Sequence, residues 1–249
     1  MRSPSEDRAG AKQPGPRRSV LVTGGNRGIG LATALRLRES GHKVAVTYRR
    51  GAPPDGFFAV RCDIRDNEEL THAVKHVKES QGAPEIIVAN AGMLHESAMN
   101  ATSDADFDDL IETNTKSALR LARLGIGGML RARWGRLIYI SSMAAFSGAP
   151  GVTAYAASKA ALLGMTRTLA WELGRHGITV NVVVPGLIDT EMTQHLNEDQ
   201  RDWYLRGTPL ARTGTADEVA AAVGFLADES ASFITGATVP VSGGLGVGL

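Results

Sequence analysis

Ser19-Val-Leu-Val-Thr-Gly24-Gly-Asn-Arg-Gly28-Ile-Gly30 joins a short run of apolar, mostly β-branched residues to a cluster of glycines. The run is typical of a strand buried on both faces, and the helical spacing of Leu31 and Leu35 predicts a helix directly after the glycines. In such a strand–turn–helix unit, glycines let backbone N–H groups and the positive helix end approach a pyrophosphate. The stretch therefore predicts a dinucleotide site, and a glycine-rich turn without a ligand is the alternative.

Alternating strand and helix patterns continue on the carboxyl side of this unit. Apolar β-branched runs recur, and segments with helical spacing separate them, which is typical of an α/β protein. Residues 187–213 form a long stretch at the expected ligand edge, and we predict that they are a lid over the substrate. The expected strands are 19–23, 43–48, 57–62, 85–89, 136–142, 178–184 and 237–241.

Length and composition agree with one large α/β domain, since the chain has 249 residues, 43% hydrophobic and 21% charged. Residues 1–17 are rich in Pro, Gly, Arg and Ser without apolar periodicity, so we predict a disordered tail ahead of a domain at 18–249. The net charge of +1 gives no electrostatic reason to expect nucleic acid or an anionic membrane as a partner.

The sequence also indicates the cellular compartment of the protein. Cys62 is the single cysteine, which excludes an internal disulfide and fits a reducing compartment. The chain lacks both the ~20-residue apolar run of a membrane span and the apolar core of a signal peptide. We therefore expect a cytoplasmic protein that does not associate with membranes.

Arginines stand where the second strand is expected to end. An NAD site places an acidic residue there to hold the ribose 2′-hydroxyl, whereas this chain has Tyr48-Arg49-Arg50. Arg27 lies in the glycine stretch as well, and guanidinium groups bind a 2′-phosphate through charge-assisted hydrogen bonds. The sequence favours NADPH over NADH, with surface arginines at a strand end as the alternative.

Polar residues follow the third and fourth expected strands. Asp63 is placed to accept from an adenine amino group, or the segment caps the next helix through Asp66. Asn90-Ala-Gly92 leaves room for a cofactor while Asn90 bonds a neighbouring strand, and a plain turn is the alternative. His72 and His76 have metal-ligand spacing, but with no nearby cysteine and no H-E-x-x-H pattern we predict a solvated helix face and no metal.

Four residues carry groups suited to proton transfer. Asn114 falls inside an expected helix, where asparagine competes for backbone hydrogen bonds, and such a misfit often marks a functional site. The fifth strand delivers Ser142 to the edge that holds the glycines. Tyr155 and Lys159 are four residues apart in a helix, so they share a face, and a cation lowers the pKa of a neighbouring phenol. Such a tyrosine can exchange a proton with an oxygen whose carbon gains or loses hydride.

Together these residues resemble the short-chain dehydrogenase/reductase family, from about Ser19 to the C-terminus. Thr-Gly-Gly-Asn-Arg-Gly-Ile-Gly and Pro-Gly-Leu-Ile-Asp-Thr-Glu-Met-Thr are similar to its 3-oxoacyl-[acyl-carrier-protein] reductase branch. The resemblance implies a single Rossmann-type doubly wound domain with a seven-stranded parallel sheet flanked by helices, assembled as a homotetramer. The shared pattern is Thr23-Gly24-x-x-x-Gly28-Ile-Gly30, Asn90-Ala-Gly92, Asn114, Ser142, Tyr155-x-x-x-Lys159 and Pro185-Gly186 with Thr190.

The resemblance further implies NADPH-dependent reduction of a 3-oxoacyl thioester, linked to acyl carrier protein or CoA, in fatty acid biosynthesis or elongation. Ser142 would hydrogen-bond the substrate carbonyl, and Tyr155 would protonate its oxygen. Lys159 would lower the pKa of Tyr155 and bind the nicotinamide ribose, and Asn114 would link Lys159 to solvent through a backbone carbonyl and water. Asp63 would meet the adenine and Thr190 the nicotinamide amide. The implied cofactor-binding residues are Gly24, Asn26, Arg27, Gly28, Ile29, Gly30, Arg49, Asp63, Ile64, Asn90, Ala91, Gly92, Tyr155, Lys159, Pro185, Gly186, Ile188 and Thr190.

Two features leave the substrate open. Met93-Leu-His-Glu-Ser97 departs from the common pattern of the branch, and His176 stands where the branch usually has arginine. A ketoreductase acting on a polyketide or another small carbonyl is one alternative, and a non-catalytic NADP(H)-sensing binder is another. Because an acidic carrier protein needs cations near the cleft, the docking candidates beside Trp134 are Arg131, Arg133, Arg136, Arg175 and His176, with a solvated face as the alternative.

Overall fold

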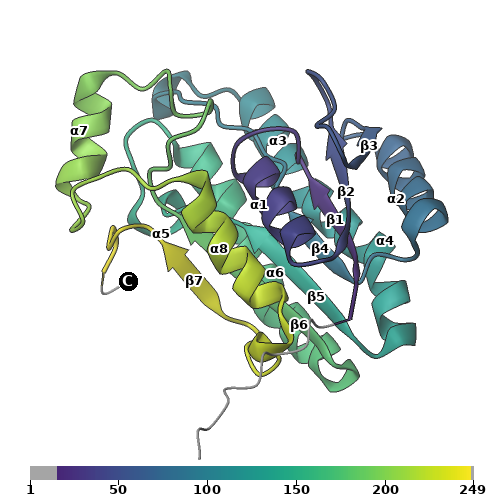
Figure 1. Cartoon of the computed structure of the whole chain (residues 1–249). Helices are drawn as coiled ribbons and strands as arrows, with labels where there is room; N and C mark the ends of the chain where they lie inside the picture. The colour runs from purple at the N-terminus through teal and green to yellow at the C-terminus, as the bar shows by residue number, and fades with distance from the viewer. Residues whose placement is uncertain (1–15, 248–249) are drawn as a thin grey trace, which may run out of the picture.

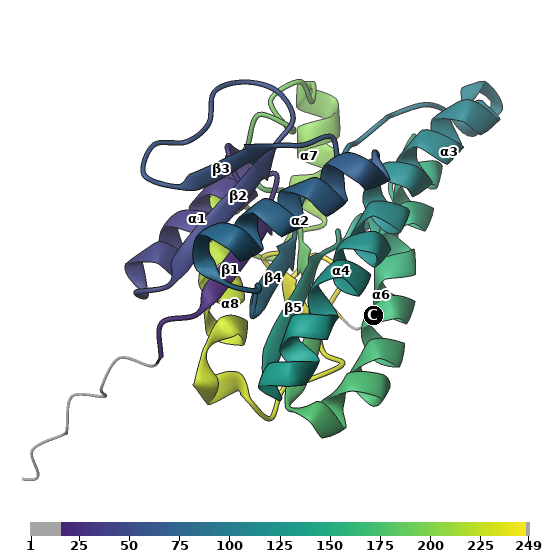
Figure 2. The ribbon, with the colours of Figure 1, turned by 90° about the vertical axis from the view of Figure 1, so that its right-hand side faces the viewer.

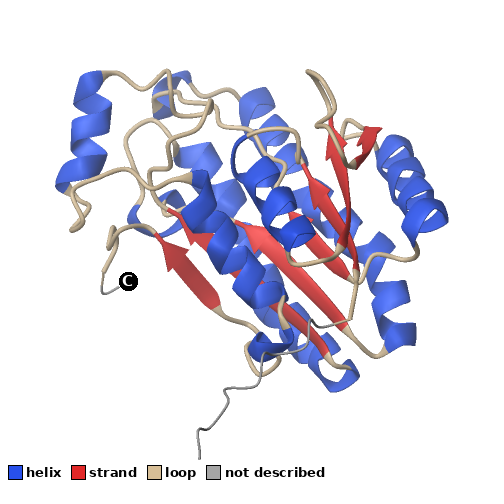
Figure 3. Cartoon of the chain, in the orientation of Figure 1, coloured by secondary structure: helices blue, strands red, loops and turns tan. Residues whose placement is uncertain are grey.

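Seven parallel strands form one sheet in the computed structural model, which describes residues 16–247. The strand order is β3-β2-β1-β4-β5-β6-β7, and Figure 3 shows the strands side by side with helices on both faces. The predicted tail at 1–17 lies outside the described residues except for its last two positions, which are exposed. The strands are β1 (Ser19–Thr23), β2 (Lys43–Tyr48), β3 (Phe58–Arg61), β4 (Ile86–Ala89), β5 (Gly135–Ile140), β6 (Ile178–Pro185) and β7 (Thr238–Val241).

Helices cover the sheet in two layers. α1 (Gly28–Glu39) and α8 (Ala216–Ala227) pack side by side on one face, in front of the strands in Figure 1. α2 (Asn67–Gln81), α4 (Ser117–Ala132) and α6 (Thr153–Leu173) cover the other face, as the turned view in Figure 2 shows. Three shorter helices are α3 (Asp104–Ile111), α5 (Ala144–Ser147) and α7 (Glu198–Arg206). No described helix is long and apolar enough to cross a bilayer.

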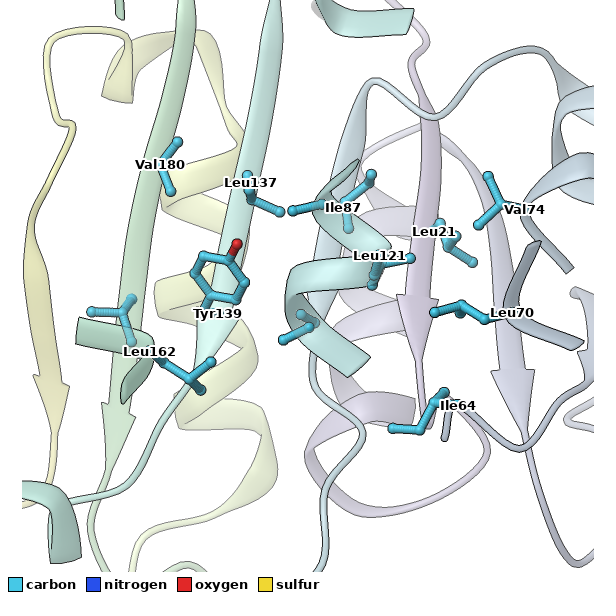
Figure 4. Close-up of a cluster of buried hydrophobic side chains, with 14 of the residues drawn as sticks. Leu21, Ile64, Leu70, Val74, Ile87, Leu121, Leu137, Tyr139, Leu162 and Val180 are labelled. Atoms are coloured by element: carbon cyan, nitrogen blue, oxygen red, sulfur yellow. The ribbon is translucent and has the colours of Figure 1, made fainter. Parts of the chain in front are cut away.

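Alternate residues of each strand serve the two layers, which is why the central strands read as continuous apolar runs. Leu21, Ile87 and Leu137 point toward α2, α4 and α6 and belong to the buried cluster drawn in Figure 4. Their neighbours, such as Val22 and Val88, belong to the cluster under α1 and α8. Each fully buried side chain of this size contributes about 1.5–3 kcal/mol, so the pattern that fixes the strands also fixes the three-layer packing.

The strand order reverses between β1 and β4. The chain builds outward from β1 to β3 and then returns to place β4 against the other side of β1. At such a reversal the loops that leave the two strands run to opposite faces of the sheet, and open α/β sheets bind ligands in the crevice between such loops, at the carboxyl ends of the strands. The predicted glycine turn and Asn90 both lie at this point.

Some element boundaries differ from those predicted. β5 ends at Ile140, so Ser142 lies in the loop after the strand rather than within it. Residues 187–213 are not only loop, because they contain α7. This short helix is mostly polar, and its start is fixed by a capping box between Asn197 and Gln200.

Candidate active site

The glycine turn between β1 and α1 has the close backbone approach that the sequence predicts. Gly24 and Gly28 have φ of +65° and +51°, a region that favours glycine. A Cβ on Gly30 would lie 2.1 Å from the Gly24 carbonyl oxygen, so no other residue fits there. No described side chain caps the first turn of α1, which leaves its N–H groups available to an anion. The turn therefore fits a pyrophosphate.

Asn90 ties this turn to the end of β4. Its side-chain Nδ2 donates to the carbonyl oxygens of Thr23 at 2.9 Å and Gly24 at 3.2 Å. The Thr23 hydroxyl accepts in return from the backbone N–H groups of Asn90 and Ala91, both at 3.1 Å. The predicted bonding of Asn90 across the strands is confirmed, and it holds the two loops that border the crevice.

Charged residues gather at the ends of β2 and β3. Asp63 hydrogen-bonds Arg65 at 2.7 Å and lies 3.7 Å from Arg49. The hydrogen bond with Arg65 is the main reason that the pKa of Asp63 lies below its ordinary value, with Arg49 adding a smaller effect. Asp66 accepts from the first turn of α2, as predicted for the capping alternative, so the two aspartates have separate roles. The buried Ile64 lies between them.

The glycine turn also contacts the lid segment. Arg27 forms an exposed ion pair with Glu191 at 2.9 Å, and Asn26 donates to the Arg50 carbonyl oxygen at 2.9 Å. Arg27 and Arg49 thus reach the same edge from the turn and from β2. Thr190 lies against the turn as well, 3.5 Å from where a Cβ on Gly28 would stand.

Asn114 sits in a single π-helical turn, Glu112–Lys116, between α3 and α4. Its Oδ1 accepts from the backbone N–H of Met93 at 2.8 Å, and its Nδ2 donates to the Met93 carbonyl at 3.0 Å and to the Ser158 hydroxyl at 2.9 Å. The misfit predicted for asparagine inside a helix is therefore real, because the helix widens there. Such bulges are frequent at functional sites.

Lys159 is buried beside Asn114, with 5% of its surface exposed. Its Nζ donates to the Ile140 carbonyl oxygen at 2.9 Å, and burial lowers the pKa of its ammonium to about 8. A Cβ on Gly92 would lie 3.1 Å from Nζ and 2.9 Å from the Asn114 Oδ1. The absence of a side chain at position 92 thus leaves room for these two polar groups.

Tyr155 differs from the sequence prediction in one respect. Burial raises the pKa of its phenol above the ordinary value, a hydrogen bond with Ser142 opposes the shift, and nearby Tyr204 adds to it. The Lys159 Nζ lies 6.0 Å from the Tyr155 ring centroid. The predicted lowering of the pKa of Tyr155 is wrong for this arrangement, because burial outweighs the other effects while the Lys159 ammonium bonds Ile140.

The segment after β6 completes the border of the site. The Pro185 carbonyl accepts from the Met143 N–H at 2.9 Å, which fixes the loop bearing Ser142. Gly186 packs against Ser242, and a Cβ there would approach that backbone to 2.9 Å. Ile188 is buried and bridges to Gly214. The structure therefore brings the predicted catalytic and cofactor-binding residues to the carboxyl edge of the sheet.

A cavity of about 620 Å³ lies next to this edge. It extends along β7 and the chain after it, and its lining is mostly apolar. Met143 and Phe146, which follow Ser142 closely in the chain, are among its lining residues, whereas Tyr155 and Lys159 are not.

Two functional candidates were missed from the sequence, Gln200 and Tyr204, whereas Glu96 lies in the Met93–Ser97 stretch that departs from the pattern of the branch. Gln200 Nε2 donates to the Glu96 Oε2 at 3.2 Å, and Tyr204 is half-buried near Tyr155. The Asn197-x-x-Gln200 pattern was a signal for α7, since asparagine followed three residues later by glutamine forms a capping box. No local sequence pattern predicted that Glu96 would lie opposite Gln200.

The predicted carrier-docking cations lie elsewhere. Arg131 and Arg133 precede β5, Arg136 is the second residue of β5, and Arg175 and His176 precede β6. In a parallel sheet these positions lie at the amino edge, opposite the site. Arg136 is 1% exposed, with its guanidinium 4.3 Å from the Trp134 ring centroid and 3.5 Å from Glu229. The placement of these residues beside the cleft was wrong for this reason.

The histidine pair on α2 forms no metal centre. The rings of His72 and His76 have centroids 4.0 Å apart. Across residues 16–247, no group of three or more His, Cys, Asp or Glu side chains is arranged to hold an ion.

Several known proteins resemble this chain in sequence or in fold. The sequence model of the family described as enoyl-(acyl carrier protein) reductase matches residues 24–246. The 3-oxoacyl-[acyl-carrier-protein] reductase MabA of Mycobacterium avium is 47% identical, over 93% of this chain and 91% of its own length. The reductase FabG of Pseudomonas aeruginosa is 41% identical, over 91% and 96%. A solved structure titled "Crystal structure of gox2181" superposes with a TM-score of 0.88 at 33% identity, covering 93% of this chain and 96% of its own.

Proposed function

Since the chain belongs to the short-chain dehydrogenase/reductase family, we propose that it uses NADPH to reduce 3-oxoacyl thioesters to 3-hydroxyacyl thioesters in fatty acid synthesis. The observation that carries the proposal is the buried Asn114 and Lys159 pair beside Tyr155 and Ser142, next to an uncapped glycine turn. The 3-oxoacyl-[acyl-carrier-protein] reductases among its relatives support the substrate class.

The proton chemistry follows from the environment of each group. Ser142 and Tyr155 share a hydrogen bond, so both hydroxyls can orient a carbonyl oxygen placed between them and the nicotinamide. A bound nicotinamide would supply hydride to the carbonyl carbon. Because burial raises the pKa of Tyr155, the phenol is protonated at neutral pH and can donate its proton to the oxygen. Lys159, with a pKa of about 8, mostly carries a proton at pH 7, and its ammonium lies 6.0 Å from the centroid of the ring that becomes the phenolate.

The preference for NADPH rests on Arg27 and Arg49. Both lie at the edge where the ribose of a dinucleotide bound at the glycine turn would stand, and their present partners are the carboxylates Glu191 and Asp63. A 2′-phosphate would compete with these carboxylates for the guanidinium groups, which are exposed enough to reorient. The same site offers a 2′-hydroxyl no acidic residue from the end of β2.

The apolar cavity supports an acyl substrate. Met143 and Phe146, which follow Ser142 in the chain, are among its lining residues, and an acyl chain that extended past them would enter it. The cavity does not distinguish acyl carrier protein from CoA as the carrier, because it would hold only the acyl chain.

A homotetramer is proposed with the function. Trp171 on α6 is 89% exposed, Phe225 on α8 is half exposed, and Phe233 is fully exposed. Large apolar side chains on the surface favour burial against another copy. Sedimentation velocity is expected to give the mass of four chains, and a monomer at micromolar concentration would refute this part of the proposal.

Loss of NADPH absorbance with a panel of substrates tests the function. Acetoacetyl and longer 3-oxoacyl thioesters, on CoA and on acyl carrier protein, should be turned over faster than polyketide analogues or small ketones. No turnover of any thioester would contradict the proposal, and turnover of the small ketones alone would indicate a different ketoreductase.

A further inference from the structure

α7 projects beside the site rather than covering the sheet. In Figure 1 it stands at the outer edge of the molecule, apart from the helices that flank the strands. Its sequence is polar, and its first turn is held by the Asn197–Gln200 capping box. Its position therefore depends on a few specific contacts with the rest of the protein.

One of these contacts joins α7 to the segment that follows β4. The Gln200 side chain donates through Nε2 to the Glu96 carboxylate at 3.2 Å, while its Oε1 accepts from the Asn197 N–H at 3.1 Å. Glu96 belongs to the segment after β4, and the next residue, Ser97, donates to the Gly151 carbonyl at 2.8 Å, just before α6 begins. The bond thus links α7 to the same loops that border Tyr155.

Tyr204 lies one turn after Gln200, on the same face of α7. It packs against the buried cluster under α4 and α6 and stacks edge-on with Trp203 at a centroid distance of 5.0 Å. Tyr204 contributes to the raised pKa of Tyr155, and Glu96 contributes to the raised pKa of Tyr204, so the three side chains lie near one another. Displacement of α7 would therefore remove a wall of the site.

We propose that the Glu96–Gln200 hydrogen bond is a latch that positions α7, and with it Tyr204, over the substrate end of the site. The inference rests on the proposed reduction and makes Glu96 and Gln200 positioning residues for it. A closed latch confines the acyl thioester next to Tyr155, whereas an open latch weakens substrate binding without altering the proton-transfer groups.

Exchange of the two latch partners tests the proposal. In Gln200→Glu, the new carboxylate keeps the helix cap, because glutamate serves a capping box as well as glutamine, but it faces the Glu96 carboxylate. KM for acetoacetyl-CoA should rise about tenfold with kcat within about twofold, the effect of losing ~1.4 kcal/mol of binding. The double variant Glu96→Gln/Gln200→Glu restores a donor opposite an acceptor and should return KM to near the wild-type value.

The matched control is Gln194→Glu. Gln194 is exposed in the same segment, so this variant adds the same charge without facing Glu96, and its KM should stay unchanged. If the double variant stays as impaired as Gln200→Glu, or if Gln194→Glu raises KM equally, the latch is refuted.

Trypsin cleavage provides a readout that does not need turnover. Arg201 and Arg206 lie in α7, so an opened latch should speed cleavage there in Gln200→Glu, and the double variant should be as resistant as wild type. If wild type reduces no thioester, the proposed function fails while this comparison still tests the latch. Equal cleavage of all the variants would overturn the latch itself.

Discussion

At the residue scale, the buried ammonium of Lys159 lowers the free energy of unfolding of the protein. Burial lowers the pKa of its ammonium from 10.5 to about 8, so between these values the unfolded chain binds more protons than the folded protein. The free energy of unfolding therefore rises with pH across this range, and below pH 8 the buried charge destabilises the folded state by its full amount.

Lys159→Met is accordingly expected to inactivate the enzyme but to stabilise it. At pH 7 the gain should be about 2 kcal/mol, less than the full pKa shift because the hydrogen bond to Ile140 is lost. The gain should shrink toward pH 10.5, where the wild-type lysine loses its proton in both states. Urea unfolding at the two pH values measures it, and an equal or lower stability of the variant at pH 7 would count against a buried ammonium.

Gly92 gives a second test at the same scale. In Gly92→Ala the methyl group would lie 2.9 Å from the Asn114 Oδ1 and 3.1 Å from the Lys159 Nζ, so both polar groups must shift. We expect kcat to fall by at least about tenfold while the fold is retained. Gly164→Ala is the matched control, because no described atom lies within 4 Å of its Cβ position in α6. Equal activity of the two variants would contradict the crowding described at Gly92.

At the scale of elements, sequence patterns predicted strands better than the pieces between them. The β-branched runs located all seven strands to within about two residues, since burial on both faces demands them. The π turn around Asn114 was foreseen only as a misfit, because it depends on contacts of the turn with α6 and with Met93, which are distant in the sequence. α7 was missed because it is short and mostly polar, with its apolar residues grouped at Trp203–Leu205.

The meeting of the glycine turn with the end of β2 leads to a prediction about the cofactor. Arg27→Ala and Arg49→Ala should each weaken NADPH binding about tenfold and leave NADH binding nearly unchanged, because only NADPH carries the 2′-phosphate. Arg38→Ala, on the outer side of α1 over Phe57, is the control and should alter neither affinity. Quenching of protein fluorescence by each nucleotide gives the dissociation constants. A parallel loss for both nucleotides would place these arginines outside the 2′-phosphate site.

At the scale of the whole molecule, the sheet topology explains how residues from 24 to 190 form one site. The reversal of strand order beside β1 gathers the carboxyl ends of the strands, and the sequence motifs could predict this because each follows a strand. Contacts across the crevice could not be predicted in this way. The Glu96–Gln200 bond joins residues 104 positions apart. The cations near Trp134 could be assigned to the correct edge of the sheet only from the direction of β5 and β6.

The measurement that tests the central claim most directly compares wild type with Tyr155→Phe. Wild type should oxidise NADPH in the presence of acetoacetyl-CoA and release the 3-hydroxy thioester. Tyr155→Phe should lose at least about a thousandfold in kcat while binding NADPH with an affinity within about threefold of wild type, since only the proton donor is removed. Substantial thioester reduction by Tyr155→Phe would contradict the account, and so would a wild type that binds NADPH and reduces no 3-oxoacyl thioester.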